Sequence, residues 1–164
     1  MAALGTGAKA PEISLTSVTG QKMSVTEALK KGPVMVAFFK ISCPVCQFAF
    51  PFLERIYETY GDAQFTFVGV SQDDARDTRD FVKEFGVKFP VLLDDAKFTA
   101  SNQYGLTNVP SVFLIGTGGK IEVSAVGFVK ADLENVAAAA ARAAGKAPAS
   151  LFKRGEVVPD YKPG

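Results

Sequence analysis

The stretch "FFKISCPVCQ" at residues 38–47 decides how this chain is interpreted, because it contains the only two cysteines, Cys43 and Cys46. It overlaps "PVMVAFFKI" (33–41), an almost unbroken apolar run that predicts a strand buried on both faces. Over residues 44–60, apolar side chains recur at helical spacing. The two cysteines therefore lie where a buried strand passes into a helix.

Three kinds of site can contain such a pair. A structural zinc site needs four Cys or His ligands, and a chain with two cysteines and no histidine would have to recruit two carboxylates. Two unrelated buried cysteines are the second alternative, favoured by the apolar neighbours Val45, Phe48 and Phe50. A redox pair is the third, and the position of the motif favours it. The lack of histidine also removes the usual general base of a hydrolase.

The redox interpretation gives the two cysteines different roles. Cys43 is expected at the helix N-terminus, where unpaired N–H groups and the helix dipole stabilise a thiolate, so we predict that it is the nucleophile. Cys46 lies one turn further on the same face, within reach of a disulfide, and is predicted to resolve the mixed disulfide. Lys40 would favour the thiolate if it points at the site, and the alternative is a solvated lysine.

Strand and helix patterns alternate through most of the chain, which indicates a core built on a parallel sheet. A hairpin is expected around Thr19-Gly20, and a second buried strand at "FTFVGVS" (65–71). An amphipathic helix is expected to end at Gly86, and "PSVFLIGTGGKIEVSAVGF" (110–128) predicts another hairpin. These elements belong to the α/β class.

The end of the chain differs in composition from the rest. "KADLENVAAAAARAAG" (130–145) predicts a last helix from its alanine content. Residues 145–164 mix proline, glycine and charge without periodicity. We therefore expect one domain over residues 1–144, followed by a tail on the surface over residues 145–164.

Charge and hydropathy exclude several functions. The chain has 18 Lys and Arg against 17 Asp and Glu, with no basic block, so nucleic acid is not an expected partner. Its start lacks the apolar region of a secretory signal, and no later stretch suits a bilayer span. The sequence as it stands predicts a cytoplasmic monomer without membrane insertion. A leader removed from a longer precursor would leave the compartment open.

Four segments together resemble the thioredoxin-fold redoxin superfamily, which includes thioredoxin-like thiol-disulfide oxidoreductases and peroxidases related to alkyl hydroperoxide reductase and thiol-specific antioxidant. The resemblance covers about residues 7–144. Its most specific features are C-x-x-C with Pro51 five residues after the second cysteine, and Val109-Pro110 before a strand. The segments are "GAKAPEISL", "VMVAFFKISCPVCQFAFP", "FVGVSQDD" and "YGLTNVPSVFLIGTGGKI".

The resemblance implies a thioredoxin fold, with a central mixed β-sheet flanked by helices and an N-terminal hairpin extension. It also implies that Val109-Pro110 is a cis peptide facing the disulfide, and that the Val109 backbone pairs with an extended substrate strand. Taken alone, Pro110 would be a turn residue opening a strand. The implied substrates are protein or small-molecule disulfides and thiols, and the chemistry needs no metal and no organic cofactor.

The sequence departs from the thioredoxin pattern at two positions where an acid is expected. Ala37 replaces the buried acid that thioredoxins have six residues before the nucleophile. Ala49 replaces a Glu that related membrane-tethered reductases have three residues after the second cysteine. The missing acids favour a redox-silent protein-binding module as one alternative, whereas the intact C-x-x-C weighs against it.

A peroxiredoxin-like thiol peroxidase is the other alternative. With Cys46 as the reactive cysteine, the peroxiredoxin motif requires proline at Phe39 and threonine at Cys43. An arginine of the peroxidase pocket would fall near Pro110. All three positions differ, so we predict a thioredoxin-like thiol-disulfide oxidoreductase that uses Cys43 and Cys46.

Overall fold

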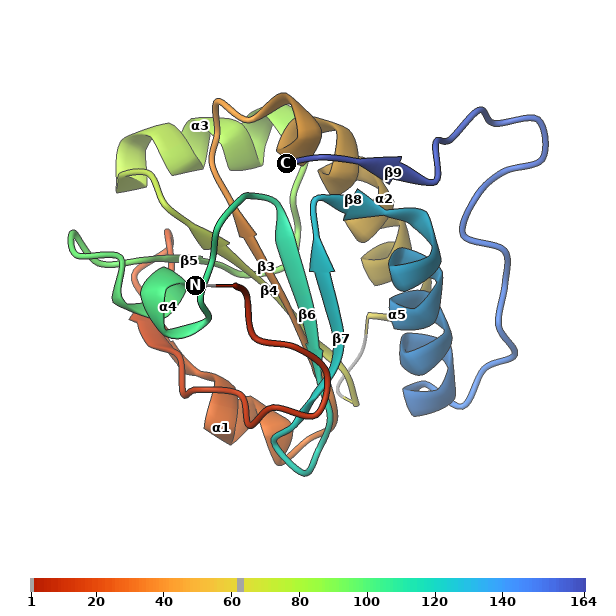
Figure 1. The fold of residues 1–164 in the computed structure, drawn as a ribbon, viewed down its shortest axis with the longest axis horizontal. Helices are drawn as coiled ribbons and strands as arrows, with labels where there is room; N and C mark the ends of the chain where they lie inside the picture. Colours follow the sequence, from red (N-terminus) through yellow and green to blue (C-terminus); the bar gives the residue numbers. More distant parts are fainter. Residues whose placement is uncertain (1, 62–63) are drawn as a thin grey trace.

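Six consecutive buried residues form β3 (Val34–Phe39), the middle strand of a five-stranded sheet in the order β5-β4-β3-β6-β7 (Figure 1). The computed structural model describes residues 2–61 and 64–164. Strands β4 and β5 run parallel to each other and to β3, whereas β6 is antiparallel to β3 and β7 to β6. The other strands of the sheet are β4 (Thr66–Ser71), β5 (Val91–Leu93), β6 (Ser111–Ile115) and β7 (Ile121–Val126).

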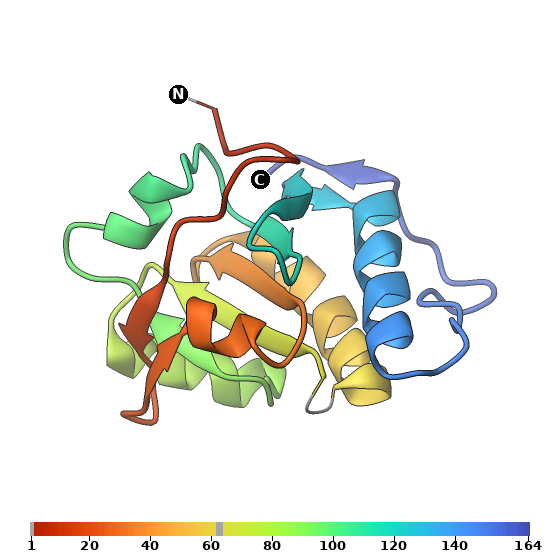
Figure 2. The ribbon, with the colours of Figure 1, turned by 90° about the horizontal axis from the view of Figure 1, so that it is seen from below.

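Both faces of this sheet are covered by other elements, which explains the unbroken apolar run of β3. Met35, Ala37 and Phe39 belong to the core shared with α2, α3 and α5. The alternate residues Val34, Val36 and Phe38 belong to a second core with the N-terminal segment, α1 and α4 (Figure 2). The helices are α1 (Val25–Leu29), α2 (Pro44–Tyr60), α3 (Ala75–Phe85), α4 (Thr99–Gln103) and α5 (Lys130–Ala143).

The N-terminal extension is a hairpin of β1 (Ser14–Thr16) and β2 (Lys22–Ser24). Its turn contains Gly20 at a φ of 88°, a conformation that favours glycine. Val18 N donates to Val91 O at 2.9 Å, which attaches the hairpin to the edge strand β5. The predicted α/β thioredoxin fold, with a mixed central sheet and an N-terminal hairpin, is therefore confirmed.

The tail after α5 is docked along the outside of α2 and α5 (Figure 1). Leu151 is buried, the Phe152 ring packs on Phe52 with centroids 5.2 Å apart, and Arg55 forms an ion pair with Glu156 at 2.8 Å. The chain then forms β9 (Tyr161–Lys162), which pairs antiparallel with β8 (Phe128–Val129) in a separate two-stranded sheet. The sequence predicted a surface tail but neither of these short strands.

The Arg55–Glu156 ion pair predicts that tail docking depends on pH. The hydrogen bond from Arg55 lowers the pKa of Glu156 from its ordinary 4.5 to about 2 in the docked tail. A lowered pKa stabilises docking above pH 4.5, and this contribution is lost as the pH falls towards about 2. The hydrogen-exchange protection factors of residues 151–156, which correct for the pH dependence of intrinsic exchange, should therefore fall across this interval. Glu156→Gln should remove the dependence, while Glu134→Gln on exposed α5 surface should retain it.

Candidate active site

The cysteine motif lies where β3 ends and α2 begins, as the sequence predicted. Cys43 is the N-cap of α2, with extended backbone angles of φ −86° and ψ 114°. Pro44 takes the first helical position, where its missing N–H leaves no carbonyl of the helix unpaired. Cys43 Sγ accepts a hydrogen bond from Cys46 N at 3.2 Å, so the sulfur occupies the place of a capping oxygen.

Two side chains hold the loop between β3 and Cys43 in place. Asp73 Oδ2 accepts a hydrogen bond from Ile41 N at 2.8 Å, and Gln47 Nε2 donates to Ile41 O at 2.8 Å. The backbone N–H and the backbone carbonyl of Ile41 are thus each held by a side chain from a different part of the chain. The sequence predicted no role for either residue, although Asp73 belongs to the quoted segment "FVGVSQDD" and lies two residues after β4.

The two thiols differ in exposure. Cys43 is half-buried, whereas Cys46 is fully buried. Burial raises the pKa of the Cys46 thiol, and its hydrogen bond with the neighbouring Cys43 raises it further. At neutral pH Cys46 is therefore a protonated, shielded thiol, and Cys43 is the sulfur that a substrate can reach.

The loop before β6 brings a distant part of the chain to Cys43. The Val109-Pro110 peptide is cis, as the resemblance implied. Cys43 Sγ donates to Val109 O at 3.4 Å, across 66 positions of sequence. Pro110 is buried, and its carbonyl accepts from Gly127 N at 2.7 Å. The structure thus brings Cys43, Cys46, Val109 and Pro110 together, while their roles in exchange stay predictions.

Lys40 lies near this loop, just after β3. Its side chain is exposed, which suits a solvated lysine, and a role in stabilising a Cys43 thiolate stays a prediction. It shares a depression of about 260 Å³ with Asn108 and Val109.

The comparison with known proteins places this arrangement in a family. Residues 6–124, well over half of the chain, match the AhpC/TSA family. The chain belongs to this family.

Several proteins similar to this AhpC/TSA-family chain are named thiol-disulfide oxidoreductases. ResA from Bacillus thuringiensis (strain Al Hakam), a thiol-disulfide oxidoreductase, is 27% identical over 122 residues, which are 74% of this chain and 69% of ResA. The thioredoxin domain of a thiol-disulfide oxidoreductase from Bacteroides vulgatus superposes with a TM-score of 0.71 at 28% identity, covering 81% of this chain and 95% of that one. The C-x-x-C motif of such enzymes is present here as Cys43 and Cys46.

The fold is also shared with a peroxidase-type protein. The peroxidoxin BcpB from Mycobacterium tuberculosis superposes with a TM-score of 0.71 at 22% identity, covering 85% of this chain and 97% of that one. Similarity at this level of identity shows the common fold alone. The choice between exchange and peroxidase chemistry therefore depends on the site of this family member.

Buried alanines occupy the two positions at which the sequence departs from the acids of the thioredoxin pattern. Ala37 and Ala49 are 0% and 2% exposed, so neither position supplies a proton acceptor for Cys46. The buried carboxylate of α2, Glu54, lies eight residues beyond Cys46, which is about 12 Å along a helix axis. Its Oε1 accepts a hydrogen bond from Lys88 N at 2.7 Å, and burial raises the pKa of Glu54. Glu54 is too far along α2 to take the Cys46 proton directly.

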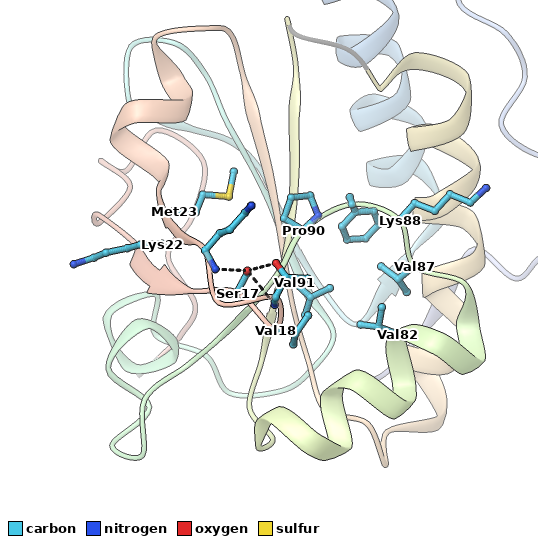
Figure 3. Close-up of a pocket in the computed structure, with 12 residues that line it drawn as sticks. Ser17, Val18, Lys22, Met23, Val82, Val87, Lys88, Pro90 and Val91 are labelled. Atoms are coloured by element: carbon cyan, nitrogen blue, oxygen red, sulfur yellow. Dashed lines mark hydrogen bonds between the residues drawn. The ribbon is translucent and has the colours of Figure 1, made fainter.

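A separate pocket of about 420 Å³ lies between the N-terminal hairpin and the entry to β5 (Figure 3). Hydrogen bonds around Ser17 close the hairpin turn beside it. None of the predicted site residues lines this pocket, so it is not part of the disulfide site. Its lining includes Ser17, Val18, Lys22, Met23, Val82 and Pro90.

Two further findings concern the described part of the chain, residues 2–61 and 64–164. No three His, Cys, Asp or Glu side chains lie together there in a way that would hold a metal ion. None of the helices in these residues is long and apolar enough to cross a bilayer.

Proposed function

We propose that this chain catalyses thiol-disulfide exchange, with Cys43 as the attacking sulfur and Cys46 as the resolving one. The observation that carries this proposal is the setting of Cys43. Its half-buried sulfur caps the N-terminus of α2, 3.2 Å from Cys46 N, and contacts the loop of the cis proline. The names of the curated relatives support the same chemistry.

In the first step, the Cys43 thiolate attacks one sulfur of a substrate disulfide. A bond forms between Cys43 Sγ and that sulfur, and the second substrate sulfur leaves as a thiolate. The N-terminus of α2 stabilises the attacking thiolate through its free N–H groups and dipole.

In the second step, Cys46 attacks Cys43 Sγ and releases the remaining substrate sulfur as a thiolate. Cys46 must lose its proton as it attacks, and the thiolate released in the first step is the acceptor that we assign, because Ala37 and Ala49 supply none. The substrate disulfide gains two electrons, and the chain is left with a Cys43–Cys46 disulfide. The same steps in reverse transfer a disulfide to a dithiol.

The loop at Val109 is the surface that we assign to a peptide substrate. An extended peptide pairs with exposed backbone groups of its receptor, and Val109 presents its carbonyl beside Cys43 Sγ. A disulfide held along this loop has one of its sulfurs close to Cys43. Val109 and Pro110 therefore position a peptide substrate in the proposed reaction.

The test of the proposed function is a redox titration of the two cysteines. In buffers of defined ratio of reduced to oxidised glutathione, the chain should lose two hydrogens reversibly, with a midpoint between about −270 and −120 mV, the range of C-x-x-C oxidoreductases. Mass spectrometry after trapping free thiols measures the oxidised fraction. A pair that stays reduced throughout, or forms only intermolecular dimers, would contradict the proposal.

Peroxidase activity is expected to be weak. Phe39, where peroxiredoxins have proline, is fully buried, and so is Cys46, the sulfur that the peroxidase alignment would make reactive. Hydrogen peroxide should therefore oxidise the reduced chain only at the slow rate of an ordinary thiolate at Cys43. Stopped-flow measurement of peroxide consumption checks this expectation. Fast, saturable consumption that survives Cys43→Ala would show that Cys46 is a peroxidatic cysteine.

A further inference from the structure

The end of the described chain reaches the same carbonyl group that contacts the attacking cysteine. Cys43 Sγ donates to Val109 O at 3.4 Å, and Asn108 Nδ2 donates to Gly164 O at 3.2 Å. Gly164 lies so close to Val109 O that a Cβ atom at residue 164 would overlap this oxygen. The tail therefore covers one side of the loop that we assign to a peptide substrate.

Residues 160–164 form this covering segment, which we call the strap. Lys130 N donates to Asp160 O at 2.9 Å, and β9 pairs with β8. Lys162 Nζ lies 5.0 Å from the centre of the Phe48 ring, a cation–π contact with the second turn of α2. The strap is thus held by α5, by β8 and by the helix that carries Cys43.

One glycine on the sheet side permits this close approach. Gly127 has a φ of 82°, and a Cβ atom there would come within 2.5 Å of the Lys162 carbonyl oxygen. The backbone of the strap therefore lies directly against the turn between β7 and β8. Such close backbone packing shows that the strap binds at a defined position beside the cis-proline loop.

The strap is held more weakly than the part of the tail before it. Residues 149–156 are fixed by buried Leu151, by the Phe152 ring and by the Arg55–Glu156 ion pair. The strap itself has one two-residue strand, single hydrogen bonds to the Asp160 and Gly164 carbonyls, one cation–π contact and exposed residues such as Tyr161. Firm attachment of residues 149–156 keeps the weakly attached strap at high effective concentration beside the Val109 loop, yet lets the strap detach from it.

We propose that the strap is a built-in competitor for the peptide part of a substrate. Resting on the proposed function, this inference assigns the strap to substrate selection. A small disulfide reaches half-buried Cys43 with the strap in place. An extended peptide that pairs with Val109 must first displace Gly164, so its apparent affinity falls by the fraction of molecules whose strap is open.

The experiment compares two neutral disulfides as substrates of the reduced chain. One is bis(2-hydroxyethyl) disulfide, and the other is a disulfide-linked dimer of a short uncharged peptide. Gly164→Val displaces the strap, because its side chain has no room against Val109 O, and its backbone has no positive φ that would add strain. Lys162→Ala removes the contact with Phe48.

Matched controls make the same chemical changes elsewhere. Gly118→Val introduces the same side chain in the turn between β6 and β7, where a Cβ meets nothing within 4 Å. Arg154→Ala removes an exposed cation from the tail outside the strap. Neither control residue contacts Cys43 or the Val109 loop, so both control variants should react with both disulfides at the original rates.

The expected result is a faster reaction with the peptide disulfide and an unchanged reaction with the small disulfide. Lys162→Ala should raise the rate with the peptide disulfide by about twofold to fivefold, the value of an exposed cation–π contact. Gly164→Val should raise it by at least as much, and neither variant should change the rate with the small disulfide. Hydrogen exchange at residues 160–164 should also accelerate when the peptide is trapped on Cys43 in the Cys46→Ala variant.

The other outcomes overturn the inference and are separable from failure of the proposed function. Unchanged peptide rates in both variants, or equal gains for both substrates, would show that the strap does not select against peptides. Either result would leave disulfide exchange at Cys43 intact. A chain that reacts with neither disulfide, with or without the strap contacts, would instead contradict the proposed function.

Discussion

Replacing Cys43 by alanine is expected to abolish disulfide exchange, whereas replacing Cys46 by alanine should stop the reaction halfway. Cys43 is the more exposed of the two sulfurs and accepts a hydrogen bond from Cys46 N at 3.2 Å, so the first bond to substrate cannot form without it. Cys46 is fully buried, and burial raises the pKa of its thiol. With Cys46→Ala, the mixed disulfide on Cys43 should therefore accumulate instead of being resolved.

Mass spectrometry after mixing each variant with a peptide disulfide measures this result. Cys46→Ala should gain the mass of one peptide at Cys43, and Cys43→Ala should stay unmodified. A thermal unfolding curve for each variant shows that the fold is retained. An adduct on Cys46 in the Cys43→Ala variant would reverse the roles and support the peroxidase alternative.

Much of the fold could be predicted because two local patterns specify it. The six apolar residues of β3 require a cover on both faces, and helices and the N-terminal layer supply one on each side. Gly86, at φ 63°, ends α3 in the left-handed conformation that its position indicated. These signals act within a few residues of sequence, so a single sequence displays them.

The site could be predicted only in part, because its other half lies far away in the chain. The C-x-x-C motif and its place at a helix start are local features. The contact of Cys43 with Val109 spans 66 positions, and only the resemblance to a family indicated it. The supports from Asp73 and Gln47 to Ile41 depend on the exact path of the loop, which no periodicity encodes.

The docking of the tail could not be predicted, for a related reason. Residues 145–164 contain no repeat of apolar positions, because they are neither helix nor long strand and bury isolated side chains such as Leu151. Their partners Phe52 and Arg55 are on α2, about a hundred positions earlier. Composition alone therefore predicted a surface tail, and missed that it returns to the site.

The largest loss of stability from one side chain is expected at Phe50, in the middle of α2. Its ring is fully buried and packs against Phe39, Phe81 and Phe89, with centroids 4.5, 5.3 and 6.0 Å away. These rings join α2 to β3, to α3 and to the segment before β5. Phe50→Ala should lower the free energy of unfolding by about 3 to 5 kcal/mol, through lost burial and the cavity left behind.

Urea unfolding followed by circular dichroism measures this loss, with Phe98→Ala as the control. Phe98 is 42% exposed and packs in neither core, so its removal should change the free energy of unfolding by less than about 0.5 kcal/mol. A domain is typically stable by only about 5 to 15 kcal/mol, so the Phe50 variant should unfold at a much lower urea concentration. A loss below about 1 kcal/mol would mean that the neighbouring rings close the cavity. The attachment of α2, and with it the position of Cys43 at the end of β3, would then depend on the rest of the helix instead of this aromatic cluster.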